Sequence, residues 1–195
     1  MKLPIYAYGH PILRKETQEI EELNEETKKL IADMFDTMYG SRGVGLAAPQ
    51  IGKALRLFII DGSPFGEDEA ENEEEEKENA FLKTFKRVFI NPIIEEETGE
   101  EWGFEEGCLS IPGVREEVFR KERVVISYYN ENWEFVEEEL TGYAARVVQH
   151  EYDHIEAKLF TDYLSPLKKR LIKRKLTDIS KGIVPVKYKM KFPKK

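Results

Sequence analysis

An apolar stretch with helical spacing contains the pentapeptide H-E-Y-D-H at residues 150–154. In a helix, His150 and His154 lie one turn apart on the same face, so their imidazoles can converge on one metal ion, with Glu151 close enough to act on a metal-bound water. By itself, such a string is equally compatible with a charged helix that binds no metal. The neighbouring apolar stripe consists of Tyr143, Val147, Val148 and Ile155. The histidines are therefore expected on or beside a buried face, where a pair of imidazoles needs either a metal or hydrogen-bond partners, and this favours a metal site.

Cys108, the only cysteine of the chain, is the candidate for a third ligand. It lies in the segment E-G-C-L-S at residues 106–110, which is followed by I-P-G. A catalytic metal site usually has three protein ligands and one open position. A free cysteine is most often a small buried hydrophobe, and the residue alone leaves this alternative open. As a ligand beside two imidazoles, a thiolate suits divalent iron, zinc or nickel.

A third segment, G-V-G-L-A-A-P-Q-I-G at residues 43–52, combines small residues with one amide side chain. Glycine lets a backbone approach a ligand closely. The segment has neither the G-K-[ST] of a phosphate loop nor the dinucleotide fingerprint, so no dinucleotide is expected. Gln50 is a candidate hydrogen-bond donor in a site. The alternative is a plain turn between a helix and the strand expected at residues 55–60.

Together, the three segments resemble the motifs of the peptide deformylase family. The family patterns, in the family's order, are G-x-G-x-A-A-x-Q at residues 43–50, E-G-C-x-S at 106–110 and Q-H-E-x-D-H at 149–154. The resemblance runs from about Leu3 to about Leu164, with further matches at residues 9–14 and 91–92. One position departs from it, because many members have a glycine three residues after the second histidine, where this chain has Ala157.

The resemblance implies a reaction and the residues that perform it. Deformylases remove the N-formyl group from the initiator methionine of new bacterial polypeptides and release formate. By this resemblance, the donors to the oxyanion would be the Gln50 amide, the backbone N–H of Leu109 and the metal. Glu151 would take a proton from metal-bound water and deliver it to the departing amine. The metal, with Fe(2+) favoured and Zn(2+) or Ni(2+) possible, would be held by Cys108, His150 and His154.

The resemblance also implies a pocket for the methionine side chain. By position, its lining would be Val44, Phe104, Glu106, Tyr143, Arg146 and Val147, while the backbone of Gly45 would help to anchor the substrate. A flexible thioether suits an irregular apolar pocket, for which Arg146 is an unusual residue that could instead lie at the rim. Glu106 could pair with a site residue or with Arg115. Asp153 would either orient a ligand histidine or be a solvated charge on the helix.

The expected elements predict an α+β fold, with mostly antiparallel strands around the central metal-binding helix. The expected strands are 55–60, 87–91, 115–120, 123–129 and 134–140. An N-terminal helix capped by Asn24 should run to about Tyr39, and Thr141 should cap the metal-binding helix. Residues 67–78 hold nine acidic residues and one lysine, which is typical of a mobile, solvated loop inserted between two strands. We assign residues 1–164 to a catalytic domain and residues 165–195 to a basic C-terminal extension.

Charge is divided unevenly along the chain. Residues 163–195 contain twelve basic residues and one acidic residue, although the whole chain has a net charge of −8. Ser165 and Pro166 should start an amphipathic helix with leucines between its basic residues, and the tail after Gly182 alternates like a strand. Such a helix could simply balance an acidic body. The resemblance implies an alternative, since a C-terminal extension of the bacterial family docks on the ribosome near the exit of nascent formyl-Met peptides, and basic residues suit RNA.

Composition limits the remaining classes. No apolar run approaches the roughly 20 residues that span a bilayer, and a lone cysteine favours a reducing compartment. The N-terminus lacks the character of a secretory or transit segment, so a cytoplasmic protein is expected. A zinc endopeptidase would usually take its third ligand downstream as His or Glu, but no histidine follows His154. A catalytically silent, ribosome-associated binding protein is the other alternative, although Cys108 and Glu151 are both present.

Overall fold

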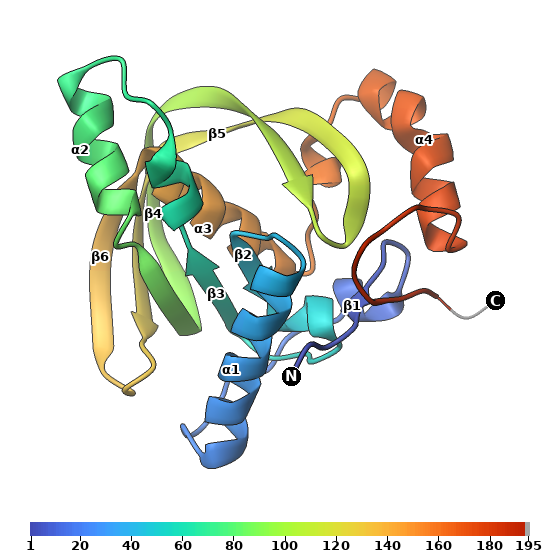
Figure 1. Cartoon of the computed structure of the whole chain (residues 1–195), viewed down its shortest axis with the longest axis horizontal. Coiled ribbons are helices and arrows are strands. Elements are labelled where there is room, and N and C mark those ends of the chain that lie inside the picture. The colour runs from blue at the N-terminus through green and yellow to red at the C-terminus, as the bar shows by residue number, and fades with distance from the viewer. Residues whose placement is uncertain (194–195) are drawn as a thin grey trace.

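A five-stranded antiparallel sheet in the order β2-β3-β4-β5-β6 forms most of the structure, a computed structural model that describes residues 1–193 (Figure 1). Its strands are β2 Gly45–Ala47, β3 Leu57–Asp61, β4 Lys86–Cys108, β5 Ile111–Tyr129 and β6 Phe135–Thr141. A separate parallel sheet joins β1, Ile5–Tyr6, to β7, Met190–Lys191. The mostly antiparallel strands predicted from the sequence are confirmed.

Strands β4 and β5 are longer than the sequence predicts. The expected strand at 87–91 is only the start of β4, which has 23 residues, and those at 115–120 and 123–129 form one strand of 19 residues. Register shifts at four places along this pair mark irregularities of the bulge type, which bend and twist a strand pair without ending it. The β4–β5 ribbon consequently curves around the helix that follows β6 (Figure 1).

That helix, α3, spans Gly142–Ile155 and carries the H-E-Y-D-H segment. Its apolar face packs into a buried cluster with residues of β3, β5 and β6. The residues that α3 contributes are Ala144, Ala145, Val147, Val148 and Ile155. The central helix expected from the hydrophobic pattern is therefore confirmed, and with it the α+β class.

The acidic segment is more ordered than its composition predicts. Residues Glu73–Leu82 form α2, which follows a 3-10 helix, η3, at Ser63–Glu67. The side chain of Asn72 caps α2 by accepting two backbone hydrogen bonds, and four glutamates in the first turn suit the positive end of the helix dipole. The prediction of a mobile loop over 67–78 is therefore wrong for residues 73–78. Their negative charges are concentrated in the first turn of a helix, where the helix dipole stabilises them.

Glu78 ties α2 to the start of α3. Thr141 occupies the N-cap position of α3, as expected, but its side chain makes no capping hydrogen bond. Instead, Oε1 of Glu78 accepts a hydrogen bond of 2.8 Å from the backbone N–H of Tyr143. Gly142 has a φ of 57°, and a Cβ at this position would collide with the Glu78 carboxylate. The acidic insertion thus supplies a cap for the helix that carries the two histidines.

The other two α-helices begin at the expected caps. Helix α1, Glu25–Gly40, is capped by Asn24, which accepts a hydrogen bond of 2.9 Å from the N–H of Thr27. Helix α4, Pro166–Ser180, follows Ser165, whose hydroxyl accepts a hydrogen bond from its first turn. Within residues 1–193, no helix has both the length and the apolar character needed to cross a membrane.

Ala157 adopts a left-handed backbone conformation, with a φ of 57°, just after the end of α3. An L-residue is less stable in this conformation than glycine, by about 1 kcal/mol, because of its Cβ. We therefore expect Ala157→Gly to raise the free energy of unfolding by about 1 kcal/mol in urea denaturation. Ala145→Gly, inside α3, is the control and should lower it by at least about 1 kcal/mol. Destabilisation of the same size by both changes would contradict the backbone argument.

Candidate active site

Three ligand atoms converge where the tip of β4 meets α3. The Sγ of Cys108 and one ring nitrogen each of His150 and His154 all lie within 4.8 Å of one another. The same Sγ atom is 3.3 Å from Nε2 of His154. The structure thus brings together the three residues that the sequence predicts as metal ligands.

This donor set fits a divalent metal ion. In a four-coordinate site with bonds of about 2.0–2.3 Å, ligand atoms lie about 3.3–3.8 Å apart, and the 3.3 Å between Sγ of Cys108 and Nε2 of His154 falls in that range. Nδ1 of His150 is 2.8 Å from Oε2 of Glu106, so its N–H faces the carboxylate and Nε2 keeps a free lone pair. Nδ1 of His154 is buried without a hydrogen-bond partner among residues 1–193. One thiolate with two imidazoles suits iron, zinc and nickel.

Glu151 lies close to the backbone of β2 at the edge of the site. A Cβ at Gly45 would collide with its carboxylate, so this approach requires glycine. In the described part of the chain, Oε2 of Glu151 is buried and has no hydrogen-bond partner. Burial raises the pKa of Glu151 to about 7; His150 opposes the rise, and the carboxylates of Glu106 and Asp153 add to it. Glu151 is therefore a buried carboxyl group with a free oxygen.

The side-chain amide of Gln50 has a fixed orientation. Its Oε1 accepts a hydrogen bond of 2.8 Å from the N–H of Ala47, so Nε2 must face the opposite way. Nε2 is 3.4 Å from Sγ of Cys108 and donates to Oγ of Ser110 at 3.3 Å. Gln50 lies in the buried 3-10 helix η2, Ala48–Ile51. The predicted donor therefore directs its N–H groups toward the candidate ligand cysteine.

The carboxylate of Glu106 is fully engaged by protein groups. It is 2% exposed and accepts from Nε of Arg120 at 2.6 Å and from Nη1 of Arg146 at 3.1 Å, besides its contact with His150. Burial would raise the pKa of Glu106, but the hydrogen bonds from His150 and Arg120 outweigh it and hold the pKa well below its usual value. The sequence suggested a site residue or Arg115 as the partner of Glu106. Glu106 contacts the site residue His150, whereas Arg115 pairs with Glu105.

Arg120 is a residue that the sequence analysis missed. Its buried guanidinium contacts Glu106 through two nitrogens and donates from Nη1 to Asp153 at 2.8 Å. Asp153 is itself buried and accepts from the hydroxyl of Tyr163 at 2.8 Å. Asp153 is therefore not a solvated charge, and it is linked to His150 through Arg120 and Glu106. Its position in the sequence could have indicated its burial, because Arg120 follows the buried Val118 by two residues and so lies on the same face of β5.

Arg146 is also buried, not placed at a rim. Its guanidinium lies 4.4 Å from the ring centroid of Trp102 and donates to the carbonyl of Val118 at 3.0 Å. Burial lowers the pKa of Arg146, and its hydrogen bond to Glu106 opposes this. The charge of Arg146, which is unusual in an apolar lining, is thus paired with the carboxylate of Glu106, the group that also contacts His150.

A cavity of about 650 Å³ opens beside these groups. Six of the seven residues predicted for substrate binding line it, namely Val44, Gly45, Phe104, Glu106, Arg146 and Val147. The seventh, Tyr143, is not among the lining residues, but its ring stacks on the lining Phe65 with 5.5 Å between centroids. The cavity is also lined by residues from segments far from every motif, among them Phe65 of η3, Lys175 of α4 and Tyr188 of the C-terminal tail.

Comparison with known proteins agrees with the motifs and the site. The family model of polypeptide deformylases matches residues 2–170. The chain belongs to the peptide deformylase family. The peptide deformylase of Christiangramia forsetii is 58% identical over 193 residues, which are 99% of this chain and 97% of that relative.

Solved deformylases share the fold. The crystal structure of a peptide deformylase from Legionella pneumophila has a TM-score of 0.77 and 38% identity, and the match covers 95% of this chain and 100% of that chain. The deformylase of Ehrlichia chaffeensis has a TM-score of 0.80 and 30% identity, with 93% of this chain and 98% of that chain covered. The chain is therefore an enzyme of a family that removes the N-formyl group from nascent peptides. This membership argues against the zinc endopeptidase alternative.

Arg120 compensates two buried carboxylates of this deformylase, so its loss should destabilise the fold. We expect Arg120→Met to lower the free energy of unfolding by about 3–5 kcal/mol, the usual cost of leaving a buried charge unpaired. Arg123→Met is the matched control, because Arg123 is a half-exposed residue of the same strand beside Glu139, and its loss should cost less than about 1 kcal/mol. Urea denaturation of the metal-loaded protein measures both. Losses of equal size would contradict the role of the network.

Proposed function

We propose that the chain is a metal-dependent hydrolase that removes the N-formyl group from the initiator methionine of nascent polypeptides and releases formate. Cys108, His150 and His154 hold the divalent metal, for which iron(II) is favoured and zinc or nickel fits the same ligands. The proposal is carried by one observation, which is that the three ligand atoms converge beside the buried carboxyl of Glu151 at the wall of the cavity.

Each residue has a separate task in this proposal. A bound divalent metal would lower the pKa of water at the site and polarise the formyl oxygen. Glu151 takes a proton from the attacking water through its free Oε2 and delivers it to the departing amine. The side-chain amide of Gln50 and the backbone N–H of Leu109 donate to the oxyanion of the tetrahedral intermediate. Glu106 holds His150 in the tautomer that presents Nε2.

The cavity receives the methionine side chain of the substrate. Val44, Phe104 and Val147 supply apolar surface for the thioether, which adapts to an irregular pocket. The backbone of Gly45 anchors the peptide. Tyr143 acts from behind the wall by supporting the rings of Phe104 and Phe65, which lie 5.4 and 5.5 Å from its own.

The direct test is formate release from a formyl-Met tripeptide by protein purified anaerobically with iron(II). A matching acetyl-Met tripeptide is the control. Rapid release from the formyl substrate alone supports the proposal, and loss of activity in air would point to iron. No release despite a filled metal site would overturn it, and cleavage of the acetyl substrate would indicate a broader acyl specificity.

Two substitutions should separate proton transfer from metal binding. We expect Glu151→Gln to keep the wild-type metal content, while kcat for formate release falls by about 10²- to 10⁴-fold. Cys108→Ser should instead lose metal during dialysis against a chelator, because a hydroxyl is a poorer ligand than a thiolate for these ions. Glu156→Gln, at the exposed end of the same helix, should change neither. Appreciable turnover by Glu151→Gln, or unchanged metal in Cys108→Ser, would contradict the assigned roles.

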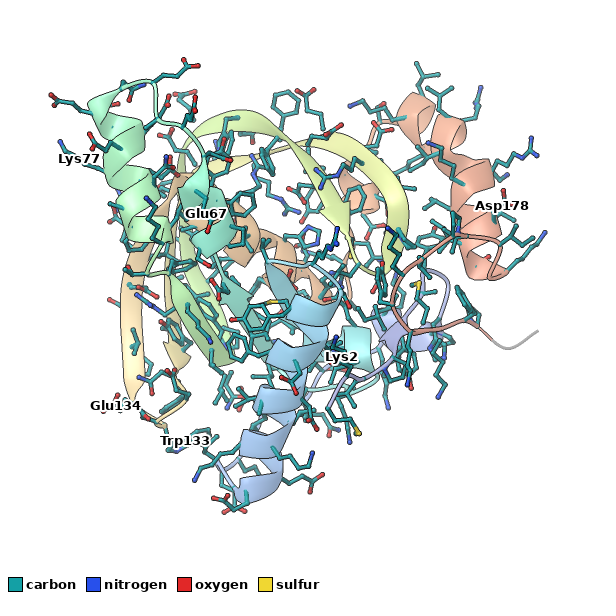
Figure 2. All side chains as sticks on the ribbon, in the orientation of Figure 1. Lys2, Glu67, Lys77, Trp133, Glu134 and Asp178 are labelled. Atoms are coloured by element: carbon teal, nitrogen blue, oxygen red, sulfur yellow. The ribbon has the colours of Figure 1, made fainter. Side chains whose placement is uncertain are left out.

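We further propose that the basic C-terminal extension binds ribosomal RNA. The exposed basic side chains of α4 are Lys169, Arg170, Lys173, Arg174 and Lys175. Among its leucines, Leu176 is buried, whereas Leu167 and Leu171 are 65% and 72% exposed. Basic α4 and acidic α2 lie at opposite ends of the molecule, as Asp178 and Lys77 mark in Figure 2. This charge separation favours an approach of α4 to a phosphate-rich surface. Lys194 and Lys195 of the extension lie outside the described residues.

Charge reversal on α4 tests this docking. We expect Lys173→Glu with Arg174→Glu to weaken binding to isolated ribosomes by at least about tenfold and to reduce the salt dependence of binding, because phosphate contacts are lost. Lys28→Glu with Lys77→Glu changes the net charge equally on other elements and is the control. Formate release from short peptides should be normal in both pairs. Equal weakening by the two pairs would show a net-charge effect and contradict docking through α4.

A further inference from the structure

The C-terminal tail reaches the candidate active site through Tyr188. Its hydroxyl donates a hydrogen bond of 2.7 Å to the backbone carbonyl of Leu109, the residue that follows the cysteine ligand. Tyr188 is half-buried and lines the same cavity as Glu151. Burial raises the pKa of Tyr188, and the nearby sulfur of Cys108 adds to this rise. A segment assigned from the sequence to a separate extension is therefore part of the cavity wall.

Leu109 lies in the turn between β4 and β5, and the pairing of these two strands does not by itself fix the backbone conformation of the turn. Cys108 and Ile111 pair across the β4–β5 ribbon, so Leu109 and Ser110 form a two-residue connection. Such connections favour turns with a positive φ, because these match the twist of the flanking strands. Neither residue is among those with a positive φ in the described chain. The orientation of this turn therefore depends on partners outside the hairpin.

Those partners are present on both carbonyl groups of the turn. The carbonyl of Leu109 accepts from Tyr188, and that of Ser110 accepts a hydrogen bond of 2.8 Å from the N–H of Tyr8. On the opposite side, a Cβ at Gly43 would lie only 2.7 Å from Cδ1 of Leu109, so the side chain packs against bare backbone. The Leu109 backbone is thus restrained from several directions, and one of these restraints is a single phenol hydroxyl.

The tail that carries Tyr188 is itself anchored. Residues 184–190 alternate between half-buried and exposed side chains, with Tyr188 on the half-buried side. The carbonyls of Lys189 and Lys191 accept hydrogen bonds of 2.9 Å from the N–H groups of Ile5 and Ala7. The hydroxyl of Tyr188 is therefore held from a fixed backbone rather than from a free end.

We propose that Tyr188 is a positioning residue for the reaction, which holds the backbone of Leu109 at its carbonyl and so keeps its N–H directed at the oxyanion. This inference rests on the proposed function, because Leu109 is assigned there as an oxyanion donor. The carbonyl and the N–H of Leu109 share one Cα, so a fixed carbonyl restricts rotation of the residue. A donor of this kind is effective only when it is oriented before the charge develops.

Tyr188→Phe removes the hydroxyl and keeps the ring. We expect kcat for a formyl-Met tripeptide to fall by about threefold to tenfold, the change that corresponds to one neutral hydrogen bond, with KM within about twofold of wild type. Tyr6→Phe is the matched control, because its hydroxyl contacts Lys191 at 3.1 Å in the same tail but away from the cavity. That variant should keep wild-type kcat, and both should keep wild-type metal content.

A second measurement does not depend on turnover. The amide nitrogen of Ser110 is bonded to the carbonyl carbon of Leu109, so its NMR resonance in zinc-loaded, ¹⁵N-labelled protein reports the hydrogen bond to that carbonyl. The resonance should shift in Tyr188→Phe and stay in place in Tyr6→Phe. An unmoved Ser110 resonance, an unchanged kcat, or an equal loss in the control would overturn the proposal. If the wild-type protein released no formate, the proposed function itself would be overturned. If the wild type were active and Tyr188→Phe were equally active, only the role of Tyr188 would be overturned.

Discussion

The contact between Glu106 and His150 is the interaction on which the site depends, because it joins the elements that form it. Glu106 comes from β4, His150 from α3, and Arg120, which neutralises the same carboxylate, from β5. A neutral imidazole offers a lone pair on one nitrogen only when its proton is on the other, so this carboxylate decides which nitrogen is available. Burying the carboxylate is costly, and two guanidinium groups offset that cost. Ligand orientation and stability of the core are therefore properties of one network.

The two candidate histidine ligands could be predicted from the sequence because their pattern is local, whereas the distant Cys108 was predicted from its family motif. His150 and His154 are one helical turn apart, and the caps Asn24 and Ser165 act within three residues of themselves. The sequence also predicted β3, β6, most of β5 and the start of β4, but not β2 or the rest of β4, and the bulges that make β4 and β5 continuous have no simple compositional signal. Ala157 shows a finer case, since only the backbone angle explains why the family pattern has glycine there.

Contacts between distant segments could not be predicted in this way. Phe65, Arg120 and Tyr188 lie outside the motifs, and each reaches the site only because the fold brings its element there. The prediction of a mobile loop for the acidic segment was wrong for another reason. Composition describes the average behaviour of like-charge runs, whereas here one cap at Asn72 and one contact from Glu78 to α3 favour a helix. The cavity wall includes Phe65, which lies just before the acidic segment, and Lys175 of the basic helix α4.

The pairing of β1 with β7 has a consequence for folding kinetics. Tyr6 and Lys191, which touch across this pair, are 185 residues apart. Closing so long a loop costs entropy that neighbouring strands do not lose, so the pair should join a core that has already formed. Interactions made after the folding transition state act chiefly on the unfolding rate. The tail therefore governs how long the folded enzyme persists more than how fast it forms.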